Sequence, residues 1–455
     1  MEIEEKLEQI LELVDNQNLR QAAAELAELD PYARAAVFEE LTNEEQINLL
    51  RAMEPGIAAD ILQEVHNMEA ARLAKQIDRD LLARIVDEME PDEAADLIGD
   101  LEQRFAAGLL ERMEEAGEVT PLLDYPDQTA GGRMTSEYLA FPEDTLVGEV
   151  VQALREWEPK QEIIPYIFVI DQDERLLGVT GPLALLRAGH TTPIGALMER
   201  DIFSVQVDED QEAAARLMSH HALAALPVVN RAGQLLGVIT FDDAIRTMED
   251  ETTEDIYDKS AIGTFGDEEM NRSYIMIKGT LWQVWRIRVP FLLITMIGGL
   301  LAGVVIDVYE QTLQVVTALA IFIPIVMDMG GNAGTQSATI FARGYVAGQI
   351  IPRHFVRQFL REVGIGLGMG TGLGILVGVV AALWQQSTRL GLVVGISLAA
   401  TILLATTLGF LVPFVLVKLG LDQAAGANPV ITTIKDITGL LIYFSLASLL
   451  LGDMF

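Results

Sequence analysis

The sequence predicts a multidomain membrane protein with an α-helical superhelical N domain, a pair of α/β units, a connecting helix and a five-helix transmembrane domain. Three observations predict this fold class. Residues 1–260 hold 57 Asp and Glu against 20 Lys and Arg, whereas residues 261–455 hold 10 against 11. Five long apolar runs follow residue 288, and two kinds of internal repeat precede it. We place the four domains at residues 1–127, 128–250, 251–285 and 286–455.

The N domain contains a repeat that is typical of stacked helices. The segment "MEPGIAADIL" (53–62) recurs as "MEPDEAADLI" (89–98), a shift of 36 residues. Periods of this size indicate helix pairs that stack into a superhelix. The proline of each copy fits the first turn of a helix, where its missing N–H does no harm. Asp92 and Asp96 fall four residues apart, on one face of the second helix.

Residues 133–250 hold two related units with strand character. "IPYIFVIDQDERLLGVT" (164–180) and "ALPVVNRAGQLLGVIT" (225–240) share an apolar strand, a polar hairpin turn and Leu-Leu-Gly-Val in that order. The pattern resembles a pair of CBS domains. Such pairs often bind adenine nucleotides, ATP among them, through the Asp of a Thr-x-x-Asp motif. The resemblance implies this role for Thr240 and Asp243, whereas "TGPL" in the first unit lacks the acid.

The apolar runs are long enough to cross about 30 Å of hydrocarbon at 1.5 Å per residue. Lys and Arg gather before the first run and between the second and third. By the positive-inside rule, the N-terminal domains lie in the cytoplasm and the C-terminus lies outside the cell membrane. The start, "MEIEEKLEQI", is acidic without an apolar core, so we expect no signal peptide. The expected spans are about 289–309, 313–341, 359–384, 390–418 and 429–451.

Two acidic residues fall inside these spans. A carboxylate in hydrocarbon costs at least about 2.5–3.5 kcal/mol on insertion scales, so each needs a reason. Asp328 and Asp436 would lie roughly 22 and 12 Å from the inner surface, at different levels, while Lys435 extends back to the inner interface. We predict an ion-conducting role for both acids. Alternatively, Asp328 braces a helix broken at "GGN". Uncharged oxygens gather nearby, from Asn332, Thr335, Gln336, Asn428, Thr432 and Thr433.

The composition limits which ions the protein is expected to bind. The chain has no cysteine, and its hard oxygen ligands favour Mg²⁺, Ca²⁺ or Mn²⁺ over softer metals. A pore with one or two acids per chain suits hydrated Mg²⁺, which keeps several of its waters. The net charge of −36 argues against nucleic acid as a partner. The acidic run "MEDETTEDIYDKS" (248–260) joins the two halves, and like charges this dense repel unless a cation bridges them. The plainer alternative is a solvated acidic helix.

The order of domains resembles the MgtE family of magnesium channels, and so do three motifs. These are "QTAGGRMTSEY" (128–138), "PIVMDMGGNAGTQSA" (324–338) and "NPVITTIKDITG" (428–439). The resemblance implies Mg²⁺ uptake by a homodimer in the lipid bilayer, with a pore between the two membrane domains. It also implies a gate, in which cytosolic Mg²⁺ bridges the acidic faces of the N domain, the CBS pair and the connecting helix. Some relatives carry an acid near Asn230, so a Mg²⁺ site in that hairpin turn is doubtful here.

The resemblance implies that Asp436 is the selectivity carboxylate, with Asn428, Thr432 and Gly439 on the pore-lining side, and the polar residues of the second span add Asp328 and Asn332 to the predicted pore residues. The predicted metal-binding residues are Asp436, Asp60, Asp92, Asp96, Asp242, Asp243, Glu249, Asp250, Glu251, Glu254, Asp255 and Asp258.

Three functions other than Mg²⁺ transport are compatible with parts of this pattern. Another CBS-regulated transporter, for an anion or an osmolyte, would need basic groups aimed into the spans, which offer carboxylates instead. A membrane-tethered divalent-cation sensor without transport leaves Asp436 unexplained. An enzyme is not expected, because the five histidines are scattered and the sequence has no nucleophile elbow, phosphate-binding loop or His-Glu-x-x-His motif.

Overall fold

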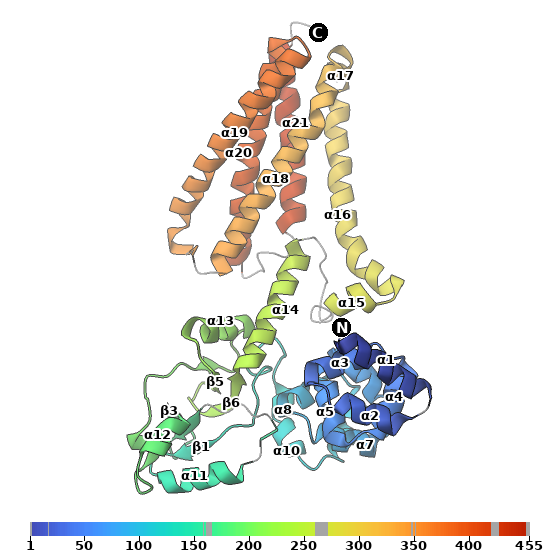
Figure 1. Cartoon of the computed structure of the whole chain (residues 1–455). Coiled ribbons are helices and arrows are strands. Elements are labelled where there is room, and N and C mark those ends of the chain that lie inside the picture. The colour runs from blue at the N-terminus through green and yellow to red at the C-terminus, as the bar shows by residue number, and fades with distance from the viewer. Residues whose placement is uncertain are drawn as a thin grey trace. The chain divides into compact units, whose positions relative to one another are not determined.

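The computed structural model describes residues 2–16, 18–157, 159–160, 166–259, 272–346, 349–350, 352–419 and 427–451. The chain forms two compact units, residues 1–251 and residues 252–455 (Figure 1). The four predicted domains divide the chain more finely than these two units, and their boundaries stay predictions.

Short helices stack through the first part of unit 1. The two copies of the sequence repeat are α5 and α8, and each begins at its proline. Small and branched apolar side chains fill the space between helices, with Phe38, Leu50 and Ile61 fully buried. The helices are α1 (Glu2–Asp15), α2 (Leu19–Ala27), α3 (Pro31–Glu39), α4 (Asn43–Ala52), α5 (Pro55–Glu64), α6 (Asn67–Ala74), α7 (Arg79–Val86), α8 (Pro91–Gly99), α9 (Gln103–Leu110) and α10 (Ala116–Val119), followed by the 3₁₀ turn η1 (Leu122–Asp124).

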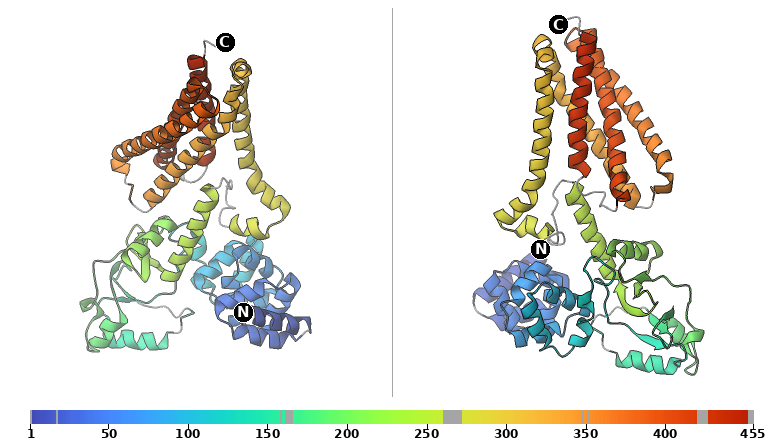
Figure 2. Two further views of the ribbon diagram at one scale, coloured as in Figure 1. Left: turned by 45° about the horizontal axis from the view of Figure 1, so that its top comes forward. Right: turned by 180° about the vertical axis from the view of Figure 1, so that it is seen from behind.

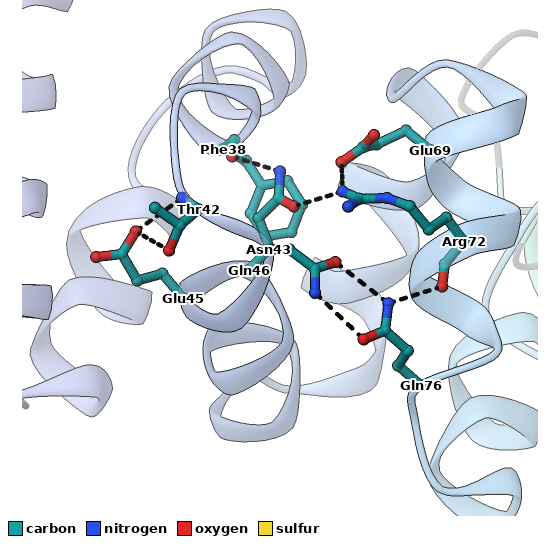
Figure 3. Close-up of polar contacts among 8 residues, drawn as sticks. All are labelled: Phe38, Thr42, Asn43, Glu45, Gln46, Glu69, Arg72 and Gln76. Atoms are coloured by element: carbon teal, nitrogen blue, oxygen red, sulfur yellow. Dashed lines mark hydrogen bonds and ion pairs between the residues drawn. The ribbon is translucent and has the colours of Figure 1, made fainter. Parts of the chain in front are cut away.

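Hydrogen bonds link neighbouring helices of this stack (Figure 3). The Gln46 side-chain amide donates a 3.1 Å hydrogen bond to the carbonyl oxygen of Phe38 and accepts a 3.3 Å bond from Arg72. Asn43 and Gln76 exchange a pair of hydrogen bonds, both 3.2 Å long. The bonds of Gln46 satisfy a buried amide and fix how α4 packs against α3 and α6, whereas the Asn43–Gln76 pair is exposed.

Two three-stranded sheets follow, with identical topology. In each, the first strand pairs parallel with the second, and the second pairs antiparallel with the third. The match agrees with the sequence repeat. Isolated bridges between Arg175 and Gln234 and between Thr135 and Val238 join the two α/β units. The elements are β1 (Ala140–Pro142), α11 (Val147–Glu156), β2 (Ile167–Ile170), β3 (Leu176–Thr180), α12 (Pro182–Arg187), η2 (Ile194–Ala196), β4 (Val205–Gln206), α13 (Gln211–His221), β5 (Ala225–Val229) and β6 (Leu235–Thr240).

Helix α14 (Phe241–Lys259) begins directly after β6 and carries the acidic run. It starts ten residues before the predicted connecting helix, because neither Pro nor Gly interrupts residues 241–259. A second helix, α15 (Arg272–Lys278), covers part of the remaining prediction. Residues 260–271, also predicted as connecting helix, lie outside the described residues.

Five helices of unit 2 are long and apolar enough to cross a membrane, which agrees with the five predicted spans. Four of them are longer than predicted, because the helix extends into the flanking residues, whereas the second of the five has the predicted length and lies five residues further along the chain. The short helix α17 (Glu310–Val315) follows the first of them, and the 3₁₀ turn η3 (Pro352–His354) precedes the third. The five are α16 (Leu281–Val308), α18 (Ala318–Val346), α19 (Phe355–Trp384), α20 (Thr388–Lys418) and α21 (Ala427–Leu451) (Figure 2).

Helices α19 and α20 approach each other backbone to backbone. A Cβ atom added at Gly374 would lie 2.5 Å from the carbonyl oxygen of Gly395, and one added at Gly395 would lie 2.7 Å from that of Gly374. Only glycine permits this distance, which compensates for the weak hydrophobic drive between helices in lipid.

Candidate functional site

Four carboxylates and two guanidinium groups surround a cavity of about 20 Å³ in unit 1. The sequence predicted Asp92 and Asp96 on one face of α8, and the fold brings the start of α14 beside that face. We call this group the carboxylate cluster. Its lining residues are Asp92, Glu93, Asp96, Gly132, Arg133, Asp243 and Arg246.

Local structure aims these side chains into the cavity. Helix α8 packs its apolar side chains into the N-domain core, which leaves its acidic side for α14. On α14, the Asp243 carboxylate accepts a hydrogen bond from the Thr240 hydroxyl at the point where β6 ends. One turn later, Arg246 pairs with Glu93 of α8 and lies 3.9 Å from Glu64 of α5.

The second arginine of the cluster precedes the first α/β unit. Arg133 Nη1 lies 3.6 Å from Asp96 Oδ2, and its Nε donates a 2.8 Å hydrogen bond to Gln211. Arg133 and Arg246 are therefore internal counter-ions that partly neutralise the carboxylates. The four lining acids outnumber these two cations.

Burial makes the charged form of these carboxyl groups less favourable. It raises the pKa of Asp92 and of Asp243 above the usual range. It also raises the pKa of Asp96 to about 7, although Arg133 opposes the shift. Beside the cavity, burial and the neighbouring Asp243 raise the pKa of Glu90 to about 8. Buried like charges produce this pattern when no further cation is present.

One oxygen of the cluster is available to a cation. Asp92 is 8% exposed, and within the described residues its Oδ1 accepts no hydrogen bond. The cavity volume exceeds the roughly 10–15 Å³ that one water needs. No group of three or more acidic or histidine side chains among the described residues is already spaced as a complete metal site. The donors therefore suit a cation that keeps part of its water shell, as Mg²⁺ does.

Unit 2, which contains the five spanning helices, has a second group of polar side chains where α21 packs against α18. The Lys435 ammonium donates a 3.0 Å hydrogen bond to the carbonyl oxygen of Met327 and lies 2.7 Å from Asp436 Oδ1. The contact with Asp436 is an ion pair without hydrogen-bond geometry. Lys435 is 6% exposed, so the expectation that it extends to the inner interface is wrong. The physical reason is space on α18, since a Cβ at Gly331 would lie 2.9 Å from the Lys435 Nζ.

The same contact corrects the predicted depths. Tyr443 donates a 2.8 Å hydrogen bond to the carbonyl oxygen of Leu319, eight residues from the Lys435–Met327 contact along each helix. This antiparallel register brings Asp328 and Asp436 within roughly one helical turn of the same level. The predicted difference in depth between the two acids is therefore wrong.

Helix α18 presents an exposed polar face within a spanning segment. Asp328, Asn332, Thr335 and Thr339 are exposed at the spacing of one helical face. The Asn332 side-chain amide donates a 3.1 Å hydrogen bond to Asp328 Oδ2. The helix continues unbroken through residues 330–332, so the alternative of a helix broken at "GGN" is wrong.

Three family models match the chain. They are a divalent cation transporter model named MgtE (residues 323–446), the MgtE intracellular N domain (29–128) and the CBS domain (194–250). The magnesium transporter MgtE of Thermus thermophilus is 34% identical over 334 residues, which cover 73% of this chain and 72% of the relative. The chain belongs to the MgtE family. The magnesium transporter MgtE of Bacillus subtilis is 31% identical over similar shares of both chains.

A solved structure of an MgtE cytosolic domain is similar to the first part of the chain. It is described as the cytosolic domain of the Mg²⁺ channel MgtE in complex with ATP. The match has a TM-score of 0.50 and 31% identity, and covers 52% of this chain and 98% of that one. The predicted family and fold class are thus confirmed. Membership places this MgtE chain in a family of membrane transporters with a cytosolic N-terminal domain.

The fold brings together only some of the predicted metal-binding residues. Asp92, Asp96 and Asp243 line the carboxylate cluster, and Asp242 precedes Asp243 in sequence. Asp60 pairs with Arg34, the carboxylate of Glu251 accepts a 2.7 Å hydrogen bond from Gln211, and Glu254 lies 3.5 Å from Arg272. Glu249 and Asp250 are exposed, Asp255 is half-buried, and the side chain of Asp258 lies outside the described residues.

The remaining predicted pore residues lie on α21. Thr432 is half-buried, and Gly439 is buried against Thr401. The side chain of Asn428 lies outside the described residues. In the hairpin turn of the second CBS unit, the Asn230 side chain accepts hydrogen bonds from the backbone N–H groups of Ala232 and Gln234, a local turn contact.

Sequence reasoning missed Glu90, Glu93, Arg133, Arg246 and the inward direction of Lys435. One signal was available, because Arg246 is the single basic residue among positions 241–258 of an otherwise acidic helix. A lone arginine in such a run indicates an internal ion pair.

Proposed function

We propose that two copies of this chain form a Mg²⁺ transport pathway across the cell membrane, used for Mg²⁺ uptake and gated by cytosolic Mg²⁺. The observation that carries the proposal is the polar face of α18 at the level of Asp436. One copy leaves Asp328 and Asn332 exposed in a spanning helix, where lipid would be a costly neighbour. A second copy related by a two-fold axis covers this face and encloses water between the two.

Within this pathway, Asp436 and Asp328 attract the cation, and uncharged oxygens such as Asn332 and Thr432 contact its water shell. Carboxylates on two copies at similar levels suit hydrated Mg²⁺, because it binds through a few acids and its own waters. Five spans and the distribution of basic residues support a C-terminus outside the cell.

The carboxylate cluster acts as the Mg²⁺ sensor in this proposal. Mg²⁺ bound at Asp92, Asp96 and Asp243 supplies the positive charge that these buried carboxylates lack, reduces the repulsion between them, and holds α8 against α14. When cytosolic Mg²⁺ is scarce, repulsion weakens this contact. Helix α14 runs from the cluster to the end of unit 1 and into unit 2, so it can transmit the change. The acids along its exposed part provide further Mg²⁺ contacts.

We further propose that the second CBS unit binds ATP or a related adenine nucleotide at Thr240 and Asp243. The ATP complex of a related cytosolic domain supports this site. Asp243 also lines the carboxylate cluster, so nucleotide and Mg²⁺ influence each other's binding.

The test is Mg²⁺ flux into proteoliposomes that hold the full-length protein, with the Mg²⁺ concentration on the cytosolic face set low and then high. Wild type conducts at low and stops at high concentration. Asp436→Ala loses conduction or selectivity. The matched control is Asp307→Ala, which removes an exposed acid at the end of α16. Flux that is unchanged in Asp436→Ala overturns the pore assignment, and absence of flux in wild type under every condition indicates a tethered sensor.

A further inference from the structure

We propose that Lys435 is a positioning residue for Mg²⁺ transport, and that its ammonium group sets how weakly Asp436 holds the passing cation. The inference rests on the proposed function, since it needs Asp436 to lie on the ion pathway. It gives a role to the positively charged Lys435 in a pathway whose other charged groups are carboxylates.

The location of Lys435 is unusual for a lysine. Among the described residues of 281–451, it is the only buried Lys or Arg. Its ammonium lies 2.7 Å from Asp436 Oδ1, although the two residues are adjacent in sequence and successive helix positions ordinarily diverge. The hydrogen bond to the Met327 carbonyl oxygen holds it in that direction.

Helix α18 is shaped to accept this side chain. A Cβ at Gly331 would lie 2.9 Å from Lys435 Nζ, and one at Gly330 would lie 3.7 Å from Lys435 Cδ. The distance from Gly330 is an ordinary van der Waals contact, so Gly331 is the position that leaves room for the ammonium group beside Met327, next in sequence to Asp328. The position of the Lys435 ammonium group is therefore set by the packing of α21 against α18, and the length of the side chain alone does not explain it.

The ammonium changes what an arriving cation meets. A divalent ion that binds Asp436 must share or displace a unit positive charge already in contact with Oδ1. Conduction needs binding that is strong enough for entry and weak enough for release. A fixed ammonium lowers the affinity of the carboxylate and therefore speeds release. Without it, the cation is held longer and the maximal flux falls.

A purely structural role makes a different prediction. If Lys435 only ties α21 to α18, its removal lowers the amount of conducting protein, and the Mg²⁺ concentration at half-maximal flux stays the same. If it tunes Asp436, the half-maximal concentration itself shifts. Flux measured across a range of external Mg²⁺ separates the two quantities.

The experiment compares wild type, Lys435→Met and Lys418→Met in proteoliposomes. Lys418→Met is the matched control, because it removes one exposed charge at the end of α20. In Lys435→Met the half-maximal concentration falls by about tenfold, as expected when a positive charge beside a divalent ion is lost, and maximal flux falls too. Lys418→Met leaves both values unchanged. A lower maximal flux with an unchanged half-maximal concentration overturns the proposal.

A second variant keeps the test decisive if Lys435→Met does not fold. Gly331→Ala retains the charge but places a methyl group against the ammonium, which must shift. It moves the half-maximal concentration, whereas Gly303→Ala, at a position where an added Cβ meets nothing within 4 Å, does not. An unmoved value in Gly331→Ala with wild-type flux present overturns the role of Lys435. Absence of wild-type flux overturns the proposed function instead.

Discussion

Tyr443 donates a 2.8 Å hydrogen bond to the carbonyl oxygen of Leu319, across 124 positions of sequence. With the Lys435–Met327 bond eight residues away, it fixes the register of α21 against α18. This register determines which polar groups of unit 2 lie at the same level along the two helices. It places Asp328 and Asp436 at similar levels.

We expect Tyr443→Phe to lower the free energy of unfolding by about 0.6 kcal/mol, the average for a hydrogen bond between membrane helices. Tyr443→Ala removes a fully buried ring and costs about 3–5 kcal/mol, because it also leaves a cavity. Unfolding of the full-length protein in detergent measures both. Equal losses in the two variants would contradict a separate contribution from the hydroxyl.

The α19–α20 contact gives a prediction with an internal control. Gly374→Ala places a Cβ 2.5 Å from the Gly395 carbonyl oxygen, so the helices must separate. Overpacking of this kind typically costs about 1–3 kcal/mol. Gly368→Ala lies on the same helix, and there an added Cβ meets nothing within 4 Å. We expect a lower unfolding temperature for the first variant alone. A similar loss in both would instead implicate the general flexibility of α19.

The spans, the helical repeat and the paired α/β units were predictable from the sequence, because each depends on a local pattern. Hydropathy over twenty residues marks a span regardless of its neighbours. The proline at the start of α5 and α8 marks a helix start in the same way.

The direction of Lys435 was not predictable, because it depends on Gly331, which is more than one hundred positions away. Nor did the sequence indicate that Arg246 meets Glu93, since only the packing of α14 on α8 brings them together. Contacts between segments that are distant in sequence determine the direction of Lys435 and the Arg246–Glu93 pair. They also determine that Asp328 and Asp436 lie at similar levels.

Arg246 is expected to hold the carboxylate cluster together without Mg²⁺. Arg246→Gln removes an ion pair to Glu93 and leaves that buried carboxylate with less positive charge beside it, since Arg133 remains. Because Arg246 is partly exposed, we expect a loss of about 1–2 kcal/mol, less than for a fully buried pair. Limited proteolysis of the full-length protein without Mg²⁺ measures the opening of unit 1, and added Mg²⁺ restores part of the protection.

The control for Arg246 is Arg231→Gln. Arg231 pairs with Asp208 at 2.7 Å, but its side chain is 87% exposed. Exposed pairs contribute little, so proteolysis stays at the wild-type rate. A faster rate in both variants would mean that unit 1 responds to net charge rather than to the contact at Glu93.

The carboxylate cluster should make the effect of Mg²⁺ depend on pH. The pKa values of Asp96 (about 7) and of Glu90 beside the cavity (about 8) are raised in the folded state, so both groups bind protons more tightly there than in the unfolded chain. Without Mg²⁺, stability is therefore highest when both are protonated, and it decreases as the pH rises towards 8. Mg²⁺ binds the ionised carboxylates and offsets this loss, so its stabilising effect grows with pH.

Thermal unfolding of the full-length protein at about pH 6 and about pH 8.5, with and without Mg²⁺, measures this linkage. We expect a larger Mg²⁺-dependent rise in unfolding temperature at the higher pH. Asp92→Asn removes the charge at the buried oxygen that accepts no hydrogen bond among the described residues, and so reduces the rise. Asp144→Asn, an exposed acid in the first α/β unit, leaves it unchanged. A Mg²⁺ effect that is equal at both pH values in wild type would place the responding carboxylates outside this cluster, because only groups with raised pKa values exchange protons for Mg²⁺ in this range.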